Sequence, residues 1–130
     1  MKLGATLYIK DTVEAVEFYK EAFGMTLGYN EKYPDGTFMH AELLRDGQQV
    51  FAVSESQNDN FVQVMLASSL KESRPTMSYG LHFDNEDEVS KAFTMLAEGG
   101  NVLFALGSLP WSSCCAEVID KYGVYWYISV

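Results

Sequence analysis

The stretch ATLYIKDTVEAVEFYKEAFG, residues 5–24, contains a strand pattern, a turn and a helix pattern in direct succession. From residue 3 to residue 10 apolar and more polar residues alternate, and this period of two predicts a strand with one apolar face. Asp11 and Thr12 then supply an N-cap, apolar residues follow at helical spacing, and Gly24 ends the helix. The residues expected to anchor this helix in the core are Val13, Val16, Tyr19, Ala22 and Phe23.

Three more strand patterns follow, separated by turn residues. Residues 25–33 and 37–45 flank Pro34-Asp35-Gly36, in which proline sets φ and glycine accepts a positive φ. Asp46-Gly47 then predicts a hairpin into a strand over residues 48–55. The first part of the chain therefore has the expected order βαβββ.

The same order returns after a connector. Residues 77–84 alternate like the first strand, Asp84-Asn85-Glu86-Asp87 caps a second helix, and Gly99-Gly100 ends that helix. Three more apolar segments complete the unit, at residues 101–106, 112–119 and 124–129. The two halves align on Asp11 and Asp84, which indicates a degenerate tandem duplication.

We therefore predict an α+β fold in which two tandem βαβββ modules form a cupped mixed sheet, with the helices on the outer face. Module one covers about 1–55 and module two about 77–130, within a single domain of residues 1–130. The connector, residues 56–76, is expected to contain one short strand or helical turn around residues 61–66.

Side-chain parity divides each strand between a face toward the helices and an opposite face. The residues expected to face the helices are Leu3, Leu7, Ile9, Met39, Ala41, Leu43, Phe51, Val53, Met77, Tyr79, Leu81, Phe83, Trp126 and Ile128. The opposite face mixes aromatic, ionisable and small residues, and it includes Tyr8, Lys10, Phe38, His40, Glu42, Leu44, Val50, His82, Asp84, Tyr125 and Tyr127. This mixture is typical of a ligand pocket, because a solvated sheet face would carry more lysine, glutamate and threonine.

Composition and charge limit the class of partner. The chain has 130 residues, 48% of them hydrophobic, and a formal net charge of −9. The apolar fraction is sufficient for a folded core, and the acidic balance argues against nucleic acid or an anionic membrane as a partner. No apolar stretch approaches the roughly 20 residues of a membrane span, and residues 1–10 do not resemble a signal peptide. We expect a soluble cytoplasmic protein.

Two adjacent cysteines, Cys114 and Cys115, are the only ones in the chain. Neighbouring strand residues point to opposite faces, so a bond between them would strain the backbone. They form neither a disulfide framework nor a zinc-binding spacing, and we interpret them as small buried residues, with redox chemistry as the alternative.

Several motifs together resemble a known family. LYIKD at residues 7–11 and AVEFYKEAFG at residues 15–24 resemble the opening of the vicinal-oxygen-chelate superfamily, also called the glyoxalase and bleomycin-resistance fold. The motifs PDG, MHAEL, AEGG and DKYG look like its PhnB-like branch, at residues 34–36, 39–43, 97–100 and 120–123. The resemblance implies two βαβββ modules forming a cupped sheet around one pocket, often in a homodimer that can exchange elements.

In metal-dependent members of this superfamily, a histidine or glutamate lies near the start of each module's first strand and on its last strand. The resemblance places these four ligand positions at Gly4, Ala52, Ser78 and Tyr127. Glycine and alanine have no donor, and neutral serine and tyrosine are weak ligands for a divalent metal. We therefore expect no metal and no other cofactor, which argues against lactoylglutathione lyase and extradiol dioxygenase activity.

The most chemically suggestive pair is His40 and Glu42, which are separated by one residue on a strand and so emerge on one face. A carboxylate beside an imidazole can hold its tautomer, which suits a general base or a substrate-binding group. The alternatives are a structural pair and, with His82, a displaced metal site, for which the sequence has no fixed ligand spacing.

Aromatic residues complete the predicted ligand-binding set. Tyr125 and Tyr127, with Tyr8 beside them, are expected to form a wall of the pocket. Trp111 lies in a loop, where either the pocket rim or a partner subunit would cover it.

Two functions follow from these observations. The first is a metal-independent binding protein for a small molecule, for which the negative net charge would suit a cationic ligand. The second is a lyase- or isomerase-type enzyme with His40 as general base and Glu42 orienting it, acting on a small carbonyl or phosphonate-related compound. A vestigial pocket filled by Tyr127 and Phe38 is the third possibility.

Overall fold

The computed structural model describes residues 1–130, except for the side chain of Asn60. Residues 1–59 and residues 60–130 form two compact units. Unit 1 has the order β1 (Thr6–Ile9), α1 (Thr12–Phe23), β2 (Thr26–Lys32), β3 (Phe38–Arg45) and β4 (Gln48–Glu55). Unit 2 has the order α2 (Asn60–Met65), the 3-10 helix η1 (Ser68–Lys71), β5 (Tyr79–His82), α3 (Glu86–Ala97), β6 (Asn101–Leu109), β7 (Ser112–Ile119) and β8 (Tyr125–Ser129).

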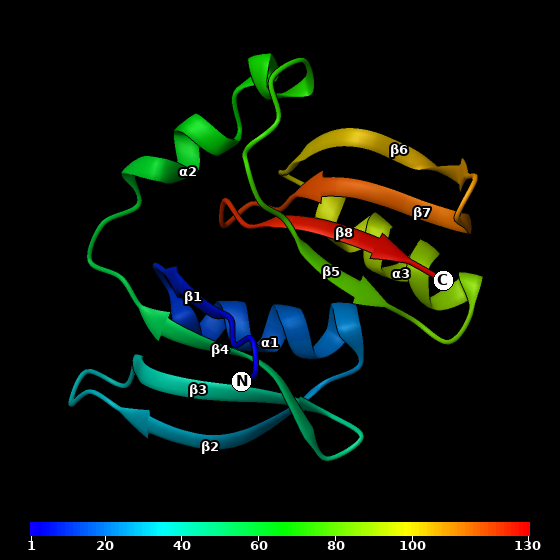
Figure 1. Ribbon diagram of the computed structural model, residues 1–130. Helices are drawn as coiled ribbons and strands as arrows, with labels where there is room; N and C mark the ends of the chain where they lie inside the picture. The colour runs from blue at the N-terminus through cyan, green and yellow to red at the C-terminus, as the bar shows by residue number, and fades with distance from the viewer. The chain divides into compact units, whose positions relative to one another are not determined.

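The predicted α+β class and the two tandem βαβββ modules are confirmed. Each module forms its own four-stranded mixed sheet, in the order β1-β4-β3-β2 and β5-β8-β7-β6, so the strands do not hydrogen-bond into one continuous sheet. The first strand of each module is parallel to the last, and the other pairings are antiparallel. Within each unit one long helix, α1 or α3, lies behind its sheet in Figure 1. Among the described residues no helix has both the length and the apolar character needed to cross a membrane.

The segment between the modules packs against unit 2. Residues 60–65 form the helix α2, so of the two alternatives for this region the helical one is correct. The Asn101 side chain donates hydrogen bonds to the carbonyl oxygens of Met65 and Ala67, at 3.3 and 2.9 Å. Gly123 has a positive φ of 86°, and a Cβ there would lie 3.2 Å from the Cα of Val62. The first part of the predicted connector is therefore a component of unit 2.

The α1 core matches the predicted periodicity with one exception. Val16, Tyr19, Ala22 and Phe23 are buried, as expected, whereas Val13 is half exposed. In the first turn of α1, Thr12 rather than Val13 points into the core, and Thr12 is fully buried. Thr12 Oγ1 accepts a hydrogen bond from the Phe38 amide at 2.9 Å, so a polar contact rather than a valine packs this end of the helix.

The parity prediction fails at the beginning of β3. Phe38 was expected on the face opposite the helix and is 4% exposed, whereas Met39 was expected in the core and is 47% exposed. The β2–β3 register shifts between Glu31 and Lys32, and such an irregularity reverses the alternation beyond it. From Ala41 onward the predicted alternation holds.

The predicted first strands of both modules are too long. Leu3 and Met77 were expected in the core, and both are exposed. The paired part of β1 begins with Thr6 opposite Ala52, and that of β5 with Tyr79 opposite Trp126. Leu3 and Met77 lie ahead of these pairs and therefore have no partner strand to shield them.

The two long helices begin differently. Asp11 was predicted as the N-cap of α1, but it has a left-handed backbone with φ of 65° and its side chain makes no capping bond. Glu55, at the end of β4, instead accepts the backbone N–H groups of Asp11 and Thr12, both at 3.0 Å. In α3 the predicted local cap is confirmed: Asn85 accepts the N–H of Glu88 at 2.9 Å.

Candidate functional site

His40 and Glu42 lie on the face of the unit 1 sheet that is turned away from α1. Ala41 and Leu43, which alternate with them on β3, are fully buried. His40 Nε2 lies 2.9 Å from Glu42 Oε2, and both side chains are partly exposed to solvent. The pair expected from the sequence is therefore a hydrogen-bonded pair that a small molecule can reach.

The Glu42 carboxylate determines which nitrogen of His40 can accept a proton. An ionised carboxylate only accepts hydrogen bonds, so Nε2 carries the proton that lies between the two side chains. The neutral imidazole then has its lone pair on Nδ1. A proton-abstracting role for His40 would therefore use Nδ1, with Glu42 holding the ring.

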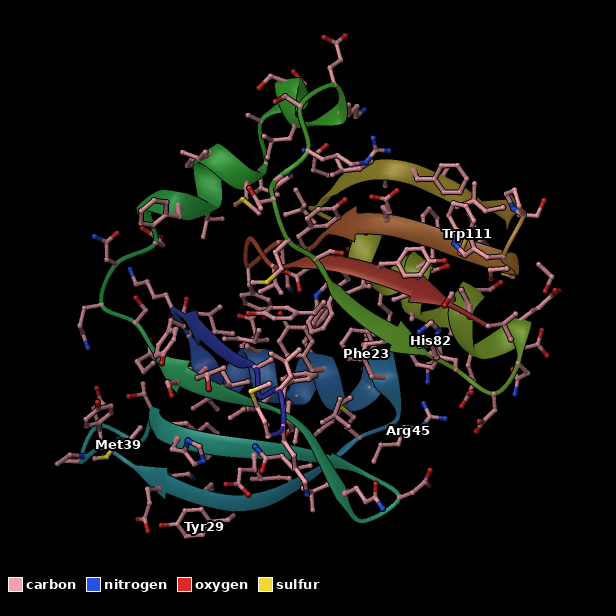
Figure 2. The ribbon with its side chains drawn as sticks, viewed as in Figure 1. Phe23, Tyr29, Met39, Arg45, His82 and Trp111 are labelled. Carbon is pink, nitrogen blue, oxygen red and sulfur yellow. The ribbon has the colours of Figure 1, made fainter. Side chains whose placement is uncertain are left out.

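Tyr29 and Glu31 of β2 extend this pair into a larger cluster. Glu31 is opposite His40 in the β2–β3 register, and the rings of Tyr29 and His40 have centroids 6.1 Å apart. The Tyr29 hydroxyl donates a hydrogen bond to Glu31 Oε1 at 2.7 Å. In Figure 2 Tyr29 lies at the outer side of β2. We call Tyr29, Glu31, His40 and Glu42 the β2–β3 cluster.

Electrostatics within this cluster are dominated by the two carboxylates. The pKa of Tyr29 is raised above its usual value of 10.0, mainly because its hydroxyl donates to Glu31 and because of the charge of Glu31. Burial and the charge of Glu42 raise it further. Both glutamates therefore act on the same hydroxyl.

Tyr29 and Glu31 were not predicted as site residues from the sequence. Their strand was predicted over residues 25–33, but its register shifts between Leu27 and Asn30, so alternation alone does not assign its faces. The signal that could have found them is their spacing of two residues on a strand joined to the His40 strand by the Pro34-Asp35-Gly36 turn.

Tyr8 and Phe38 were also predicted for this face, but only Tyr8 is exposed to solvent. Tyr8 is 74% exposed and is opposite Ser54 in the β1–β4 register. Phe38 is buried, with its amide bonded to Thr12 at the start of α1, so it cannot contact a ligand on this face. Tyr8 remains a candidate and Phe38 does not.

On unit 2 the predicted residues are joined to one another. The Trp111 indole N–H donates to the Tyr127 hydroxyl at 2.9 Å. The rings of His82 and Tyr127 are edge to face with centroids 6.5 Å apart, and His82 Nδ1 is hydrogen-bonded to Ser129 Oγ at 2.7 Å. Figure 2 shows Trp111 at the β6–β7 turn and His82 on β5. Three predicted site residues thus form one connected group.

Tyr125 belongs to a second group on the same sheet, with Glu117 and Arg74, which were not predicted as site residues. Its hydroxyl donates a hydrogen bond to Glu117, which also accepts from Arg74 Nε at 3.0 Å. Burial, followed by the hydrogen bond to Glu117 and the charge of Glu117, raises the pKa of Tyr125 to about 12. Tyr125 is buried and its hydroxyl is paired, so its pocket-wall role stays a prediction that concerns the ring alone. Arg74 lies in the predicted connector, so no strand pattern could have indicated it.

Cys114 and Cys115 are free thiols and are buried, as predicted from the sequence. Burial raises the pKa of the Cys114 thiol, with smaller contributions from Glu86 and Cys115. A raised pKa keeps this cysteine in the poorly nucleophilic thiol form.

Comparison with known proteins identifies the family. Residues 4–127 match the profile of the Glyoxalase/Bleomycin resistance protein/Dioxygenase superfamily. The chain belongs to this superfamily. An uncharacterised protein from Mycobacterium bovis is 28% identical over 128 residues, which cover 95% of this chain and 79% of the relative.

Two solved structures of similar size share the superfamily fold. A PhnB protein from Bacillus cereus is 29% identical, with a TM-score of 0.74 and coverage of 99% of this chain and 98% of that chain. A protein from Pseudomonas aeruginosa is 22% identical, with a TM-score of 0.72 and coverage of 99% and 96%. The predicted resemblance to the superfamily and to PhnB is confirmed.

At the four positions where the family resemblance places metal ligands, the residues of both units are poor ligands for a divalent metal. In unit 1 they are Gly4, ahead of β1, and Ala52 on β4, and neither has a donor atom in its side chain. In unit 2 they are Ser78, ahead of β5, and Tyr127, whose hydroxyl accepts the Trp111 N–H. Among the described side chains no three of the types His, Cys, Asp and Glu are grouped so as to hold a metal ion.

Proposed function

We propose that this protein binds a small organic molecule without a metal ion, on the sheet face of unit 1 that is turned away from α1. The observation that carries this proposal is the β2–β3 cluster, in which an aromatic ring, an imidazole and two carboxylates are accessible to solvent on one sheet face. Binding sites commonly combine apolar surface with a few placed polar groups, and Tyr8 and Tyr29 supply the apolar surface here.

Metal independence rests on the chemistry of the residues in the superfamily's ligand positions. Gly4 and Ala52 offer no donor, and Ser78 and Tyr127 as neutral hydroxyls are weak ligands. The superfamily's metal chemistry would therefore need a different set of residues in this chain.

The test is a ligand screen on protein treated with EDTA. Thermal-shift and calorimetric titration against a panel of metabolites and antibiotics should find a compound that raises the melting temperature, because a ligand that binds only the folded state stabilises it. Added Zn²⁺, Mn²⁺ or Ni²⁺ should leave the affinity unchanged. A stoichiometric metal in the purified protein, binding that requires a metal, or a panel without a single binder would each overturn the proposal.

A second candidate function, general-base catalysis, is favoured by the His40–Glu42 pair. The hydrogen bond at Nε2 leaves Nδ1 as the proton acceptor, which is the arrangement that a lyase or isomerase acting on a small carbonyl or phosphonate-related compound needs.

His40→Gln should lower the turnover of any substrate found in the screen far more than it weakens binding, while the melting temperature stays nearly unchanged. General-base catalysis contributes on the order of 10²- to 10⁴-fold, so the loss should be of that size. His82→Gln is the matched control, because His82 is hydrogen-bonded to a serine rather than a carboxylate. Full turnover by the His40 variant would leave only the binding function.

We also propose that the protein is a cytoplasmic homodimer, without nucleic acid or a membrane as partner. Its free, buried cysteines suit a reducing compartment, and its net charge of −9 opposes polyanions. Light scattering after size-exclusion chromatography should give twice the chain mass of 14.6 kDa. A monomer at micromolar concentration would contradict the dimer.

A further inference from the structure

On the sheet face of unit 1 turned away from α1, the part formed by β2 and β3 carries two carboxylates. Glu31 and Glu42 are both on this face, and their neighbours on the same face, Tyr29 and His40, bring no fixed positive charge. In the contacts described, Glu31 uses Oε1 for the Tyr29 hydroxyl and Glu42 uses Oε2 for His40. A carboxylate can accept about four hydrogen bonds, so each glutamate keeps capacity for a further donor.

The basic residues of β2 and β3, Lys32 and Arg45, contact groups outside the β2–β3 cluster. Lys32 Nζ lies over the ring of the buried Phe38, at 5.1 Å from its centroid. Arg45 Nη1 donates to the carbonyl oxygen of Phe23, at the end of α1, at 3.0 Å. Figure 2 labels Arg45 and Phe23 at these neighbouring element ends. Neither cation neutralises the two glutamates.

Aromatic surface accompanies this charge. Tyr29 is 61% exposed although its hydroxyl is held by Glu31, so its ring stays open to solvent beside the carboxylates. A cation attracted by the carboxylates can also contact the face of such a ring. The charges of Glu31 and Glu42, which raise the pKa of Tyr29, disfavour an anionic group beside its hydroxyl. The same charges favour a cationic group there.

A small inorganic cation does not fit this surface. Divalent ions require several ligand groups around one point, and the described side chains provide no such group of three. An ammonium or guanidinium group on an organic molecule needs only one or two acceptors and gains from an adjacent ring.

We propose that the β2–β3 cluster binds an organic cation, with an ammonium or guanidinium group between Glu31 and Glu42 and its apolar part against Tyr29. This inference rests on the proposed small-molecule function and names the ligand class for that site. The net charge of −9 would also increase the rate of encounter with such a ligand at low ionic strength.

Three probes that share one ring and differ in charge test the inference: benzylammonium, benzyl alcohol and benzoate. Calorimetric or NMR titration of the full chain should show benzylammonium binding about tenfold more tightly than benzyl alcohol, with benzoate weakest, and rising salt should reduce the preference. Glu31→Gln and Glu42→Gln should each weaken benzylammonium binding about fivefold.

Matched variants separate the site from the overall charge and from folding. Glu21→Gln removes the same charge from an exposed position on α1 and should leave the affinity unchanged. Tyr29→Phe keeps the ring and should retain binding, whereas Tyr29→Ala should lose several-fold. Unchanged melting temperatures in the Glu31 and Glu42 variants would show that the fold is intact.

The possible failures of the two proposals are distinguishable. Equal binding of benzyl alcohol and benzylammonium, or equal effects of the Glu21 and Glu31 variants, would overturn the cation inference and leave the small-molecule function in place. If none of the three probes binds but a neutral or anionic compound from the panel does, the cation inference alone fails. If no compound of any charge binds, both fail.

Discussion

The two units have one topology but use their non-helical sheet faces in different ways. In unit 1 the β2–β3 cluster presents Glu31, Glu42 and the ring of Tyr29 to solvent. In unit 2 the corresponding face carries Tyr125, which is buried and paired with Glu117, and Trp111, which is bonded to Tyr127 and is 70% exposed. The two copies of the fold thus carry different side chains on corresponding faces: two carboxylates beside an exposed tyrosine in unit 1, and a buried tyrosine–glutamate pair with an exposed tryptophan in unit 2.

The helix starts show the same divergence. α1 depends on Glu55, which is 43 residues from Thr12 in the chain, whereas α3 is capped by Asn85 within its own first turn. A distant cap ties the helix to β4, and a local cap stabilises only the helix end. Unit 1 therefore relies more on tertiary contacts at this point.

The largest expected effect concerns Asp120 of unit 2, the one buried carboxylate among the described side chains. Asp120 accepts hydrogen bonds from the Trp126 indole at 2.8 Å and from the backbone N–H groups of Tyr122 and Val124 at 2.9 and 3.1 Å. Asp120→Ala leaves these buried donors unpaired and should lower the free energy of unfolding by about 3 kcal/mol. Urea denaturation measures this loss.

Asp35, in the exposed β2–β3 turn of unit 1, is the matched control. It accepts from Thr37 near the surface, where water can replace it, so Asp35→Ala should have a much smaller effect. Equal losses at the two positions would remove this difference between the units.

The next prediction concerns the loss of stability when each helix cap is removed, Glu55 for α1 and Asn85 for α3. Glu55→Ala removes hydrogen bonds from two backbone N–H groups and from the Thr12 hydroxyl, and should cost about 2 kcal/mol. Asn85→Ala removes one capping bond and should cost about 1 kcal/mol. Denaturation of both variants in one buffer gives the ranking, and a larger loss for Asn85 would contradict the distant-cap interpretation.

A smaller effect concerns alkaline pH. The pKa of Tyr125 is raised from 10.0 to about 12 in the folded protein, so folding favours the protonated phenol. Its contribution to stability is fully present below pH 10 and is lost as the pH rises from 10 to about 12. Tyr125→Phe should flatten this part of the stability curve, whereas Tyr29→Phe, at an exposed position, should change it less. Unfolding midpoints between pH 9 and 12 supply the measurement.

Much of the fold was predictable from local pattern. The Asp46-Gly47 hairpin has positive φ at both residues, as its turn type requires, and β4 covers the predicted residues 48–55. The α3 cap was also predictable, because its acceptor and donor lie in one turn. The wrong predictions have non-local causes. A register shift between β2 and β3 buries Phe38 and exposes Met39, and the distant Glu55 replaces the predicted cap at Asp11.

The candidate site was predictable only in part. His40 and Glu42 share a face because strand residues two apart always do, and no tertiary information is needed for that. Tyr29 and Glu31 join them through pairing with β2, whose register shifts at two points, and Arg74 meets Glu117 from a segment without strand character.

The sequence by itself determined the order of the elements, the duplication, the family and the absence of donor side chains at Gly4 and Ala52, because these depend on residue type and on short-range spacing. Only the tertiary structure decided which polar side chains meet, that Glu55 caps α1, and that Tyr125 is held by Glu117 while the β2–β3 cluster stays accessible. Contacts between strands depend on register, and register results from the packing of the whole sheet rather than from any one segment.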